Sequence, residues 1–175
     1  MSVSDVQLTG VLRTFSTQDL VVSKTDKAGL ITYANDVFLE LAGYPEEELL
    51  GQPHSIVRHP AMPRAVFKLL WETILAGDEV FAYVVNRAKN GDEYWVFAHV
   101  TPNVDAAGAI IGFHSNRRSP RPSAVAKIKD IYSVVLAEEK RHSDRATGLD
   151  ASYKLMISLV RKAGFDSYER FVLSL

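Results

Sequence analysis

The chain has 175 residues, of which 47% are hydrophobic and 23% charged, with a formal net charge of −1 at pH 7. This length allows one hydrophobic core, and the near-neutral charge argues against nucleic acid as a partner, because phosphate binding needs clustered surplus Lys and Arg. There is no cysteine, which excludes disulfides and thiolate sites. No apolar run approaches the roughly 20 residues of a membrane helix, and residues 1–10 lack signal-peptide features. We therefore expect a cytoplasmic protein without membrane insertion.

Two segments near the start of the chain carry different patterns. Residues 4–18 have apolar residues at helical spacing and predict an amphipathic helix, which would make residues 1–19 an N-terminal helical cap. Residues 20–25 and 30–34 are typical of strands, and the turn sequence Asp-Lys-Ala-Gly separates them. We therefore predict a β-hairpin over residues 20–34.

Several helices are predicted after this hairpin. Asn35 is suited to cap a first short helix, because its side chain accepts hydrogen bonds from the free N–H groups of the first turn. Pro63 can open a stronger helix, since no N–H is missed at the first helical position. The apolar side chains of that helix recur at helical spacing and form one stripe: Phe67, Leu70, Trp71 and Ile74.

Three further strands are predicted over residues 79–88, 92–104 and 109–117. The pair Asn90-Gly91 joins the first two, as both residues tolerate the positive φ angles of a tight hairpin. Both faces of the middle strand are largely apolar, so one should line a core and the other should be covered by a helix or a partner chain. The order of elements predicts an α+β domain with a five-stranded antiparallel sheet and short helices on one face.

Residues 119–175 are predicted to be C-terminal helices that follow a stiff Ser-Pro-Arg-Pro-Ser linker. Gly148 is expected to separate two of these helices. Their apolar stripes can pair two chains in a homodimer or cover the sheet of their own chain, and both interpretations stay open. The predicted organisation is thus a cap, a sheet domain over residues 20–118, and a helical extension.

The main candidates for a binding site are polar residues. His54, Arg58 and His59 lie among three prolines, where they can hold an anion or simply cap nearby helices. Asn35 and Asn86 each carry a donor and an acceptor, which suits the edge of a heterocycle, although Asn35 also suits a helix cap.

Catalytic and metal-binding motifs are missing from the sequence. It contains no Gly-x-Ser-x-Gly elbow, no glycine-rich phosphate loop and no paired histidine spacing of a zinc site. One buried histidine could ligate a haem iron, and His99 and His114 lie on neighbouring predicted strands. We expect that the protein is not an enzyme.

Four segments resemble a known family. They are ITYAND (31–36), GYPEEEL (43–49), GQPHSIVRHPAMP (51–63) and NRAKNGDEYWV (86–96). Together they resemble the PAS domains of the bacterial aerotaxis-receptor group, over about residues 20–118.

This resemblance implies a PAS fold and a noncovalently bound FAD whose redox state is the signal, as in aerotaxis and chemotaxis. The positions that match flavin-pocket residues of the family, or flank that pocket, are Asn35, Arg58, His59, Phe67, Trp71 and Asn86.

Two positions depart from the family pattern. Ala61 stands where the group typically has Asp, and the segment that begins at Val80 replaces one that typically carries Trp. Phe81 or Tyr83 can supply that aromatic ring instead, and strand parity decides which way each side chain points.

Three functions are compatible with these residues. The first is a flavin-based sensor of redox state or oxygen that signals to a downstream protein by contact. The second is a cofactor-free PAS module for dimerisation or interaction, and the third is a haem sensor.

Overall fold

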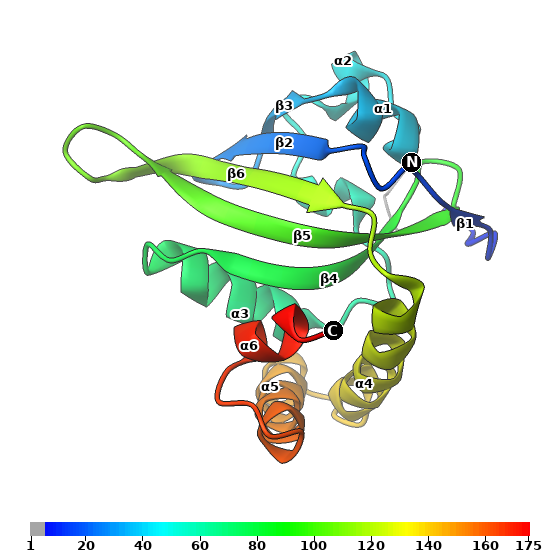
Figure 1. Cartoon of the computed structure of the whole chain (residues 1–175), viewed down its shortest axis with the longest axis vertical. Coiled ribbons are helices and arrows are strands. Elements are labelled where there is room, and N and C mark those ends of the chain that lie inside the picture. Colours follow the sequence, from blue (N-terminus) through cyan, green and yellow to red (C-terminus); the bar gives the residue numbers. More distant parts are fainter. Residues whose placement is uncertain (1–5) are drawn as a thin grey trace.

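The computed structural model of the protein describes residues 6–175 and shows a curved sheet flanked by helices (Figure 1). The strands are β1 (Leu12–Arg13), β2 (Val21–Asp26), β3 (Ile31–Ala34), β4 (Val80–Arg87), β5 (Glu93–Val104) and β6 (Ile110–Arg118). The helices are α1 (Asp36–Ala42), α2 (Glu46–Leu49), the 3₁₀ turn η2 (His54–Val57), α3 (Arg64–Leu75), α4 (Pro122–Lys140), α5 (Arg145–Lys162) and α6 (Tyr168–Leu173). The predicted α+β class is confirmed.

The antiparallel part of the sheet has the strand order β4-β5-β6-β2-β3. Both predicted hairpins are present. In the first, Asp26 Oδ1 accepts hydrogen bonds from the N–H groups of Ala28 and Leu30, each at 2.9 Å. In the second, Gly91 has a φ of 97°, which favours glycine over any residue with a Cβ. Local turn chemistry therefore determines both reversals of the chain.

The prediction of an N-terminal helix was wrong for the part of it that the structure describes, residues 6–18. Instead, β1 adds a sixth strand that runs parallel to β5, pairing Leu12 with Glu93 and Arg13 with Tyr94. This edge of β5 is open because β6 pairs with it only from Phe97 onward. An open edge offers unpaired N–H and C=O groups, and these outweigh a weak helical pattern. The predicted five-stranded sheet thus becomes a mixed sheet of six strands.

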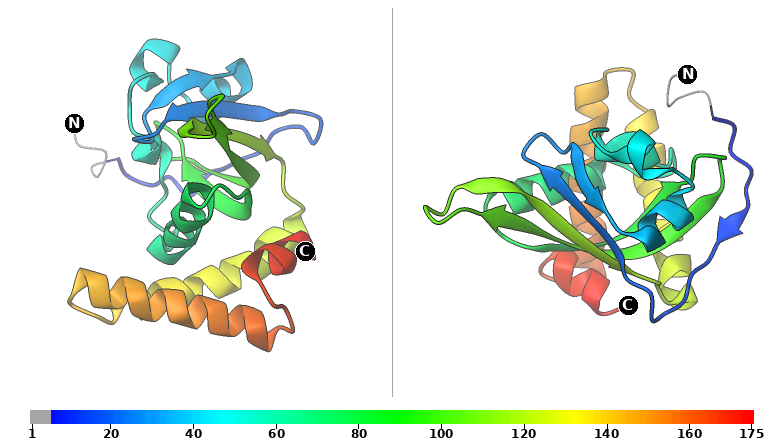
Figure 2. Two further views of the ribbon diagram at one scale, coloured as in Figure 1. Left: turned by 90° about the vertical axis from the view of Figure 1, so that its left-hand side faces the viewer. Right: turned by 90° about the horizontal axis from the view of Figure 1, so that it is seen from above.

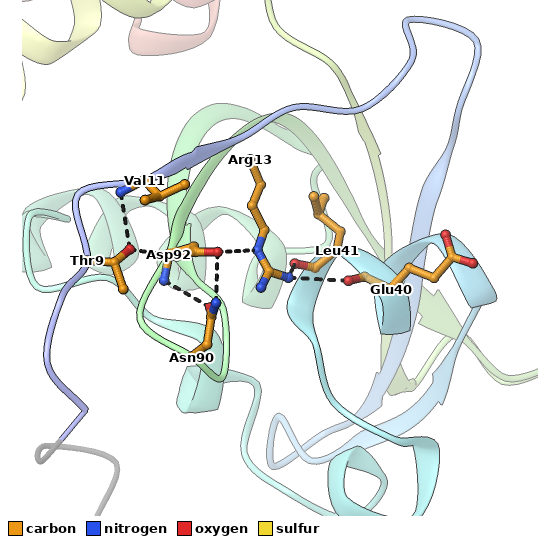
Figure 3. A network of polar contacts seen from close by, with 7 residues as sticks. All are labelled: Thr9, Val11, Arg13, Glu40, Leu41, Asn90 and Asp92. Atoms are coloured by element: carbon orange, nitrogen blue, oxygen red, sulfur yellow. Dashed lines mark hydrogen bonds and ion pairs between the residues drawn. The ribbon is translucent and has the colours of Figure 1, made fainter.

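Asp92 holds the N-terminal segment in place (Figure 3). Its carboxylate accepts hydrogen bonds from Thr9 at 2.6 Å, from Arg13 at 2.8 Å and from Asn90 at 2.9 Å. These bonds, in that order of importance, lower the pKa of Asp92 to about 2. Arg13 also donates to the carbonyl oxygen of Leu41 at 3.0 Å, which links the segment to the end of α1. The network joins three parts of the chain that lie far apart in the sequence.

The two faces of the sheet are covered by different helices. Strand parity places Tyr94 and Val96 on the inner face, toward α1, η2 and α3, and places Trp95 on the outer face. Figure 2, in its left-hand view, shows α4, α5 and α6 on the opposite side of the sheet from α1 and α2. Both faces predicted to be apolar are therefore covered within one chain.

The outer face is closed by aromatic residues of the C-terminal helices. The hydroxyl group of Tyr132 on α4 donates to the carbonyl oxygen of Tyr83 at 2.7 Å and lies 2.6 Å from the hydroxyl group of Tyr168 on α6. The ring of Tyr132 also stacks on Trp95, with the ring centroids 6.4 Å apart. Of the two interpretations of the C-terminal stripes, the structure shows the intramolecular one.

Gly148 does not separate two helices as predicted but lies inside α5, buried against α4. A Cβ atom at this position would come within 2.5 Å of the carbonyl oxygen of Glu139. The glycine is needed because the two helices approach each other closely here. The side chain of Glu139, on α4, reaches across to α3 at the same place.

Candidate functional site

A cavity of about 300 Å³ lies between the inner face of the sheet, η2 and α3. All four members of the predicted apolar stripe on α3 line it. The opposite wall consists of alternate residues of β4, β5 and β6, because side chains two positions apart in a strand point to the same side. The polar groups in this lining come from the strands and from the proline-rich loop, whereas α3 contributes apolar side chains alone.

Four of the six predicted site residues meet in this cavity: Arg58, Phe67, Trp71 and Asn86. The guanidinium group of Arg58 lies over the ring of Phe67, 4.2 Å from its centroid. Arg58 and Asn86 also pair through an isolated backbone bridge, which fixes the loop to β4. Trp71 is 37% exposed and its ring makes an edge contact with Phe113, so this residue lies at the boundary between the cavity and solvent.

Asn35 does not line the cavity but caps α1. Its side-chain oxygen accepts hydrogen bonds from the N–H groups of Val22 at 2.9 Å and Phe38 at 3.2 Å, and its amide donates to the carbonyl oxygen of Leu20 at 2.7 Å. These contacts join α1 to β2 and leave the side chain engaged with the backbone.

His59 also lies outside the cavity lining. Its Nδ1 accepts a hydrogen bond from the N–H group of Ala61 at 3.1 Å, and its Nε2 lies 3.8 Å from the carboxylate of Glu93. Burial lowers the pKa of His59, while the Glu93 charge acts in the opposite direction. The ring therefore stabilises the loop rather than facing a ligand.

Arg117 was missed by the sequence analysis, although it lies in the cavity wall at the end of β6. Its side chain is buried, and its Nη2 donates to Ser23 Oγ at 2.8 Å and to His54 Nε2 at 2.7 Å. Burial lowers the pKa of Arg117 to about 10, so the guanidinium group stays charged at neutral pH. The signal that could have revealed it is the alternation of Phe113, Ser115 and Arg117, which places polar groups on the core face of a predicted strand.

His54 is neutral in this arrangement. Burial, and next the positive charge of Arg117, lower the pKa of His54 from 6.5 to about 3. Because a guanidinium group can only donate, His54 Nε2 must be the acceptor, which places the ring proton on Nδ1. The imidazole also stacks on Phe38, with the centroids 5.8 Å apart. The sequence predicted that His54 belongs to a cluster that could hold an anion. The structure places His54 in the cavity lining, but as a neutral ring.

The residues that line the cavity carry net positive charge. None of the described residues in this lining is Asp or Glu, whereas Arg58 and Arg117 are both charged. Two buried polar atoms of the lining have no hydrogen-bond partner among residues 6–175, namely Arg117 Nη1 and Ser115 Oγ. A polar group buried without a partner costs free energy, so these atoms favour a ligand that supplies acceptors.

The two departures from the family pattern have different structural consequences. Ala61 is exposed in the turn after His59 and does not line the cavity. Val80 is buried on the inner face, next to Phe113 and Ile74. Phe81 and Tyr83 point to the outer face, so neither supplies the missing aromatic ring.

Other sites expected from the sequence are placed away from the cavity. His99 and His114, considered as haem ligands, lie on the outer face, where His99 contacts Glu79 at 2.6 Å and His114 contacts Asn116 at 3.0 Å. Within residues 6–175, no three His, Asp or Glu side chains are grouped to hold a metal ion. No helix in the same range has the length and apolarity needed to cross a membrane.

Comparisons with known proteins agree with this geometry. Residues 13–116 match the family model of the PAS fold, as the resemblance implied. The aerotaxis receptor of Escherichia coli K12 is 42% identical over 117 residues, which cover 67% of this chain and 23% of the receptor. A nitrogen fixation regulatory protein of Klebsiella pneumoniae is 30% identical over 91 residues, covering 52% of this chain and 18% of that protein.

A solved structure gives the same result at the level of fold. A light-oxygen-voltage domain, studied with a flavin analogue, superposes with a TM-score of 0.56 at 22% identity, covering 65% of this chain and 85% of that one. The matched region covers 23% of the aerotaxis receptor, so the similarity concerns only part of that receptor.

Proposed function

The chain belongs to the PAS family and is a sensor domain related to the aerotaxis receptor, and from this premise we propose that it senses redox state or oxygen through a noncovalently bound flavin. The observation that supports the flavin is the cavity beneath α3. It combines flat apolar side chains on one wall with hydrogen-bonding groups and two guanidinium groups elsewhere. This is the lining expected for a planar, acceptor-rich heterocycle.

The cavity residues divide by their chemistry. Phe67 and Trp71 on α3 would pack against the ring system, since aromatic side chains offer large flat contact surfaces. Asn86, Ser115 and Arg117 on β4 and β6 would meet the polar edge of the ring. A bound flavin supplies reversible electron transfer, while these residues bind it, orient it and limit the access of water.

Arg58 is the residue best placed to contact a phosphate of FAD. It lines the cavity from the proline-rich loop, and guanidinium groups bind phosphate oxygens through paired hydrogen bonds. Asn35 and His59 would support the site indirectly, because they hold α1 and the loop in place. FAD is therefore the flavin that we propose.

A route for the signal leads from the cavity to the C-terminal helices through α3. Phe67 faces the cavity from this helix, while Arg64 on the same helix binds Glu139 of α4, with Nε 2.6 Å from the carboxylate. Lys68 reaches Asp150 of α5 at 3.5 Å. A change in how α3 packs on the ligand would shift α4 and α5, as between two alternative packings. The output that we propose is noncatalytic: contact with a second copy of the chain or with a downstream signalling protein.

The test is an absorption spectrum of the purified protein between about 300 and 700 nm, before and after loading with FAD or FMN and desalting. We expect retained flavin bands and tighter retention of FAD than of FMN. Asn86→Ala should weaken flavin binding about tenfold, which is close to 1.4 kcal/mol. Asn116→Ala is the matched control, because Asn116 lies on the outer face of β6.

The other outcomes identify the alternatives. A Soret band in the freshly purified protein would favour a haem sensor. A spectrum without bands after loading would contradict the flavin and leave a cofactor-free PAS interaction module.

A further inference from the structure

Arg117 is a buried cation without an acidic partner. The residue is 5% exposed, and its side-chain hydrogen bonds within residues 6–175 go to the neutral groups Ser23 and His54. No Asp or Glu lies within ion-pair distance of it in this range, and its Nη1 has no partner at all. The aromatic ring of Phe38 lies 5.1 Å from the guanidinium carbon on one side. The remaining exposure of this charge is to the cavity.

No counter-ion within residues 6–175 offsets the desolvation of this buried charge. A buried charge that lacks a counter-ion costs free energy, and an apolar side chain of similar volume often stabilises the same position. Ser23 and His54 would keep each other as partners without Arg117, since Ser23 Oγ lies 3.2 Å from His54 Nε2. Arg117 Nη1 is therefore available to a group that enters the cavity.

The groups near Arg117 define the chemistry of that ligand. Ser115 precedes it by two positions on the same face of β6, and its hydroxyl group is likewise buried without a partner. The titratable groups that face this region are the neutral His54, the charged Arg58 and the hydroxyl group of Tyr94, whose pKa is raised by burial. No negative charge faces Arg117 from any packed element among the described residues. The site therefore matches an electron-rich acceptor edge.

Arg87 provides a useful contrast within the same domain. Its Nε and Nη2 are also buried without partners, but its side chain lies on the outer face of β4 and lines no part of the cavity. Among residues 6–175, only Arg117 combines a buried, unpartnered nitrogen with a position in the cavity wall.

We propose that Arg117 is a ligand-contacting residue, whose Nη1 binds the acceptor edge of the ligand together with the Ser115 hydroxyl group and makes the cavity bind reduced, negatively charged flavin more tightly than oxidised flavin. This inference rests on the proposed function, because it assumes that the ligand is a flavin. Reduction by two electrons with uptake of one proton leaves one negative charge on the ring system, and a fixed cation nearby stabilises that charge. Arg117 would thus link the redox state of the ligand to the electrostatics of β6.

The experiment compares the reduction potential of the FAD-loaded protein in four forms: wild type, Arg117→Met, Arg117→Lys and Arg118→Met. Dithionite supplies the electrons and solvent supplies the proton. We expect Arg117→Met to reduce the preference for reduced over oxidised flavin at least tenfold, which lowers a two-electron potential by about 30 mV. Arg117→Lys should retain most of the preference. Arg118→Met is the matched control, because Arg118 is exposed on the outer face and should leave the potential unchanged.

Thermal melting without flavin separates a ligand-binding role from a structural one. We expect apo Arg117→Met to melt no lower than the apo wild type, whereas the stabilisation by added FAD should be smaller in the variant. If Arg117→Met folds but no longer retains FAD, this result also supports the inference. The reduction potential is then compared between the wild type and Arg117→Lys. A lower apo melting temperature with an unchanged potential would overturn it. Retention of FAD by the wild type together with equal potentials in all variants overturns this inference alone, while failure of the wild type to bind FAD overturns the proposed function too.

Discussion

Arg64 and Arg117 are both arginines of the same domain in largely buried surroundings, but only Arg64 meets an acid. Arg64 binds Glu139 through its backbone N–H at 2.9 Å and its Nε at 2.6 Å, and Glu139 is nearly buried. Arg117 has neutral partners and a nitrogen with none. The difference indicates that the junction of α3, α4 and α5 pairs its charges within the chain, whereas the cavity holds a buried cation without an acidic partner among residues 6–175.

The largest effect is expected from removing Glu139, the acid that Arg64 binds. Glu139→Ala should lower the free energy of unfolding by about 3 kcal/mol, because it leaves Arg64 without its counter-ion and the first N–H of α3 without its acceptor. The measurement is urea unfolding followed by circular dichroism. Asp150→Asn is the matched control, since Lys68–Asp150 is a surface pair, and it should change stability by less than about 1 kcal/mol. Equal effects of the two substitutions would contradict the assignment of Glu139 to a buried junction.

A second substitution tests whether the C-terminal helices are held on the outer face. Tyr132→Phe should cost about 2 kcal/mol of stability, because it leaves the carbonyl oxygen of Tyr83 and the hydroxyl group of Tyr168 buried and unsatisfied. Tyr168→Phe breaks only one of these contacts and should cost less. The exposed Tyr33 is the control position, and Tyr33→Phe should have no measurable effect in the same unfolding assay. If Tyr132→Phe had the wild-type free energy of unfolding in this assay, the docking of α4 on the outer face would be contradicted.

The third prediction concerns the cavity and its neutral histidine. The pKa of His54 in the folded protein, about 3, lies below its ordinary value of 6.5. Above about pH 6.5 the ring is neutral in both folded and unfolded states, so its contribution to stability is fully present. As the pH falls below that value, His54 binds a proton in the unfolded state but stays neutral in the folded state. The free energy of unfolding therefore decreases by up to about 1.4 kcal/mol per pH unit until the folded pKa is reached. Urea unfolding at several pH values should show this slope in the wild type and a shallower slope in His54→Gln. Parallel slopes in both proteins would contradict a buried neutral His54.

Much of the candidate site could be predicted from the sequence, and what could not be predicted has a common cause. The helical stripe that includes Phe67 and Trp71 was visible as a spacing, and the motif around Arg58 and Asn86 was visible as a resemblance. The residues that surround Arg117 come from β2, α1, η2 and β6, and no local pattern connects them. Pairing of Ser23 with Ser115 sets the register that brings Arg117 within reach of Ser23, and such diagonal contacts between strands depend on the assembled sheet.

Asn35 and His59 are two residues whose positions matched the family motif but whose side chains do not line the cavity. Both match the family motif by position, yet one binds backbone groups at the start of α1 and the other binds the turn at Ala61. A motif records that a residue type is present at a position, but the direction of its side chain depends on which partners are nearest. For Asn35 the free N–H groups of the helix are nearest, as the capping preference of asparagine also predicted.

Features that depend on near neighbours in the chain could be derived from the sequence. These are the two hairpin turns, the Asn35 cap of α1, the apolar stripe of α3, and the alternation that assigns each side of β5 to a different environment. Features that depend on available partners arise only when the elements pack together. The N-terminal segment forms β1 because an edge of β5 is open. The C-terminal helices pack on the outer face because Tyr132 hydrogen-bonds the carbonyl oxygen of Tyr83 and stacks on Trp95 there. Arg117 acquired its place in the cavity for the same reason, since only the assembled sheet, loop and helix define which groups are buried and which remain without a partner.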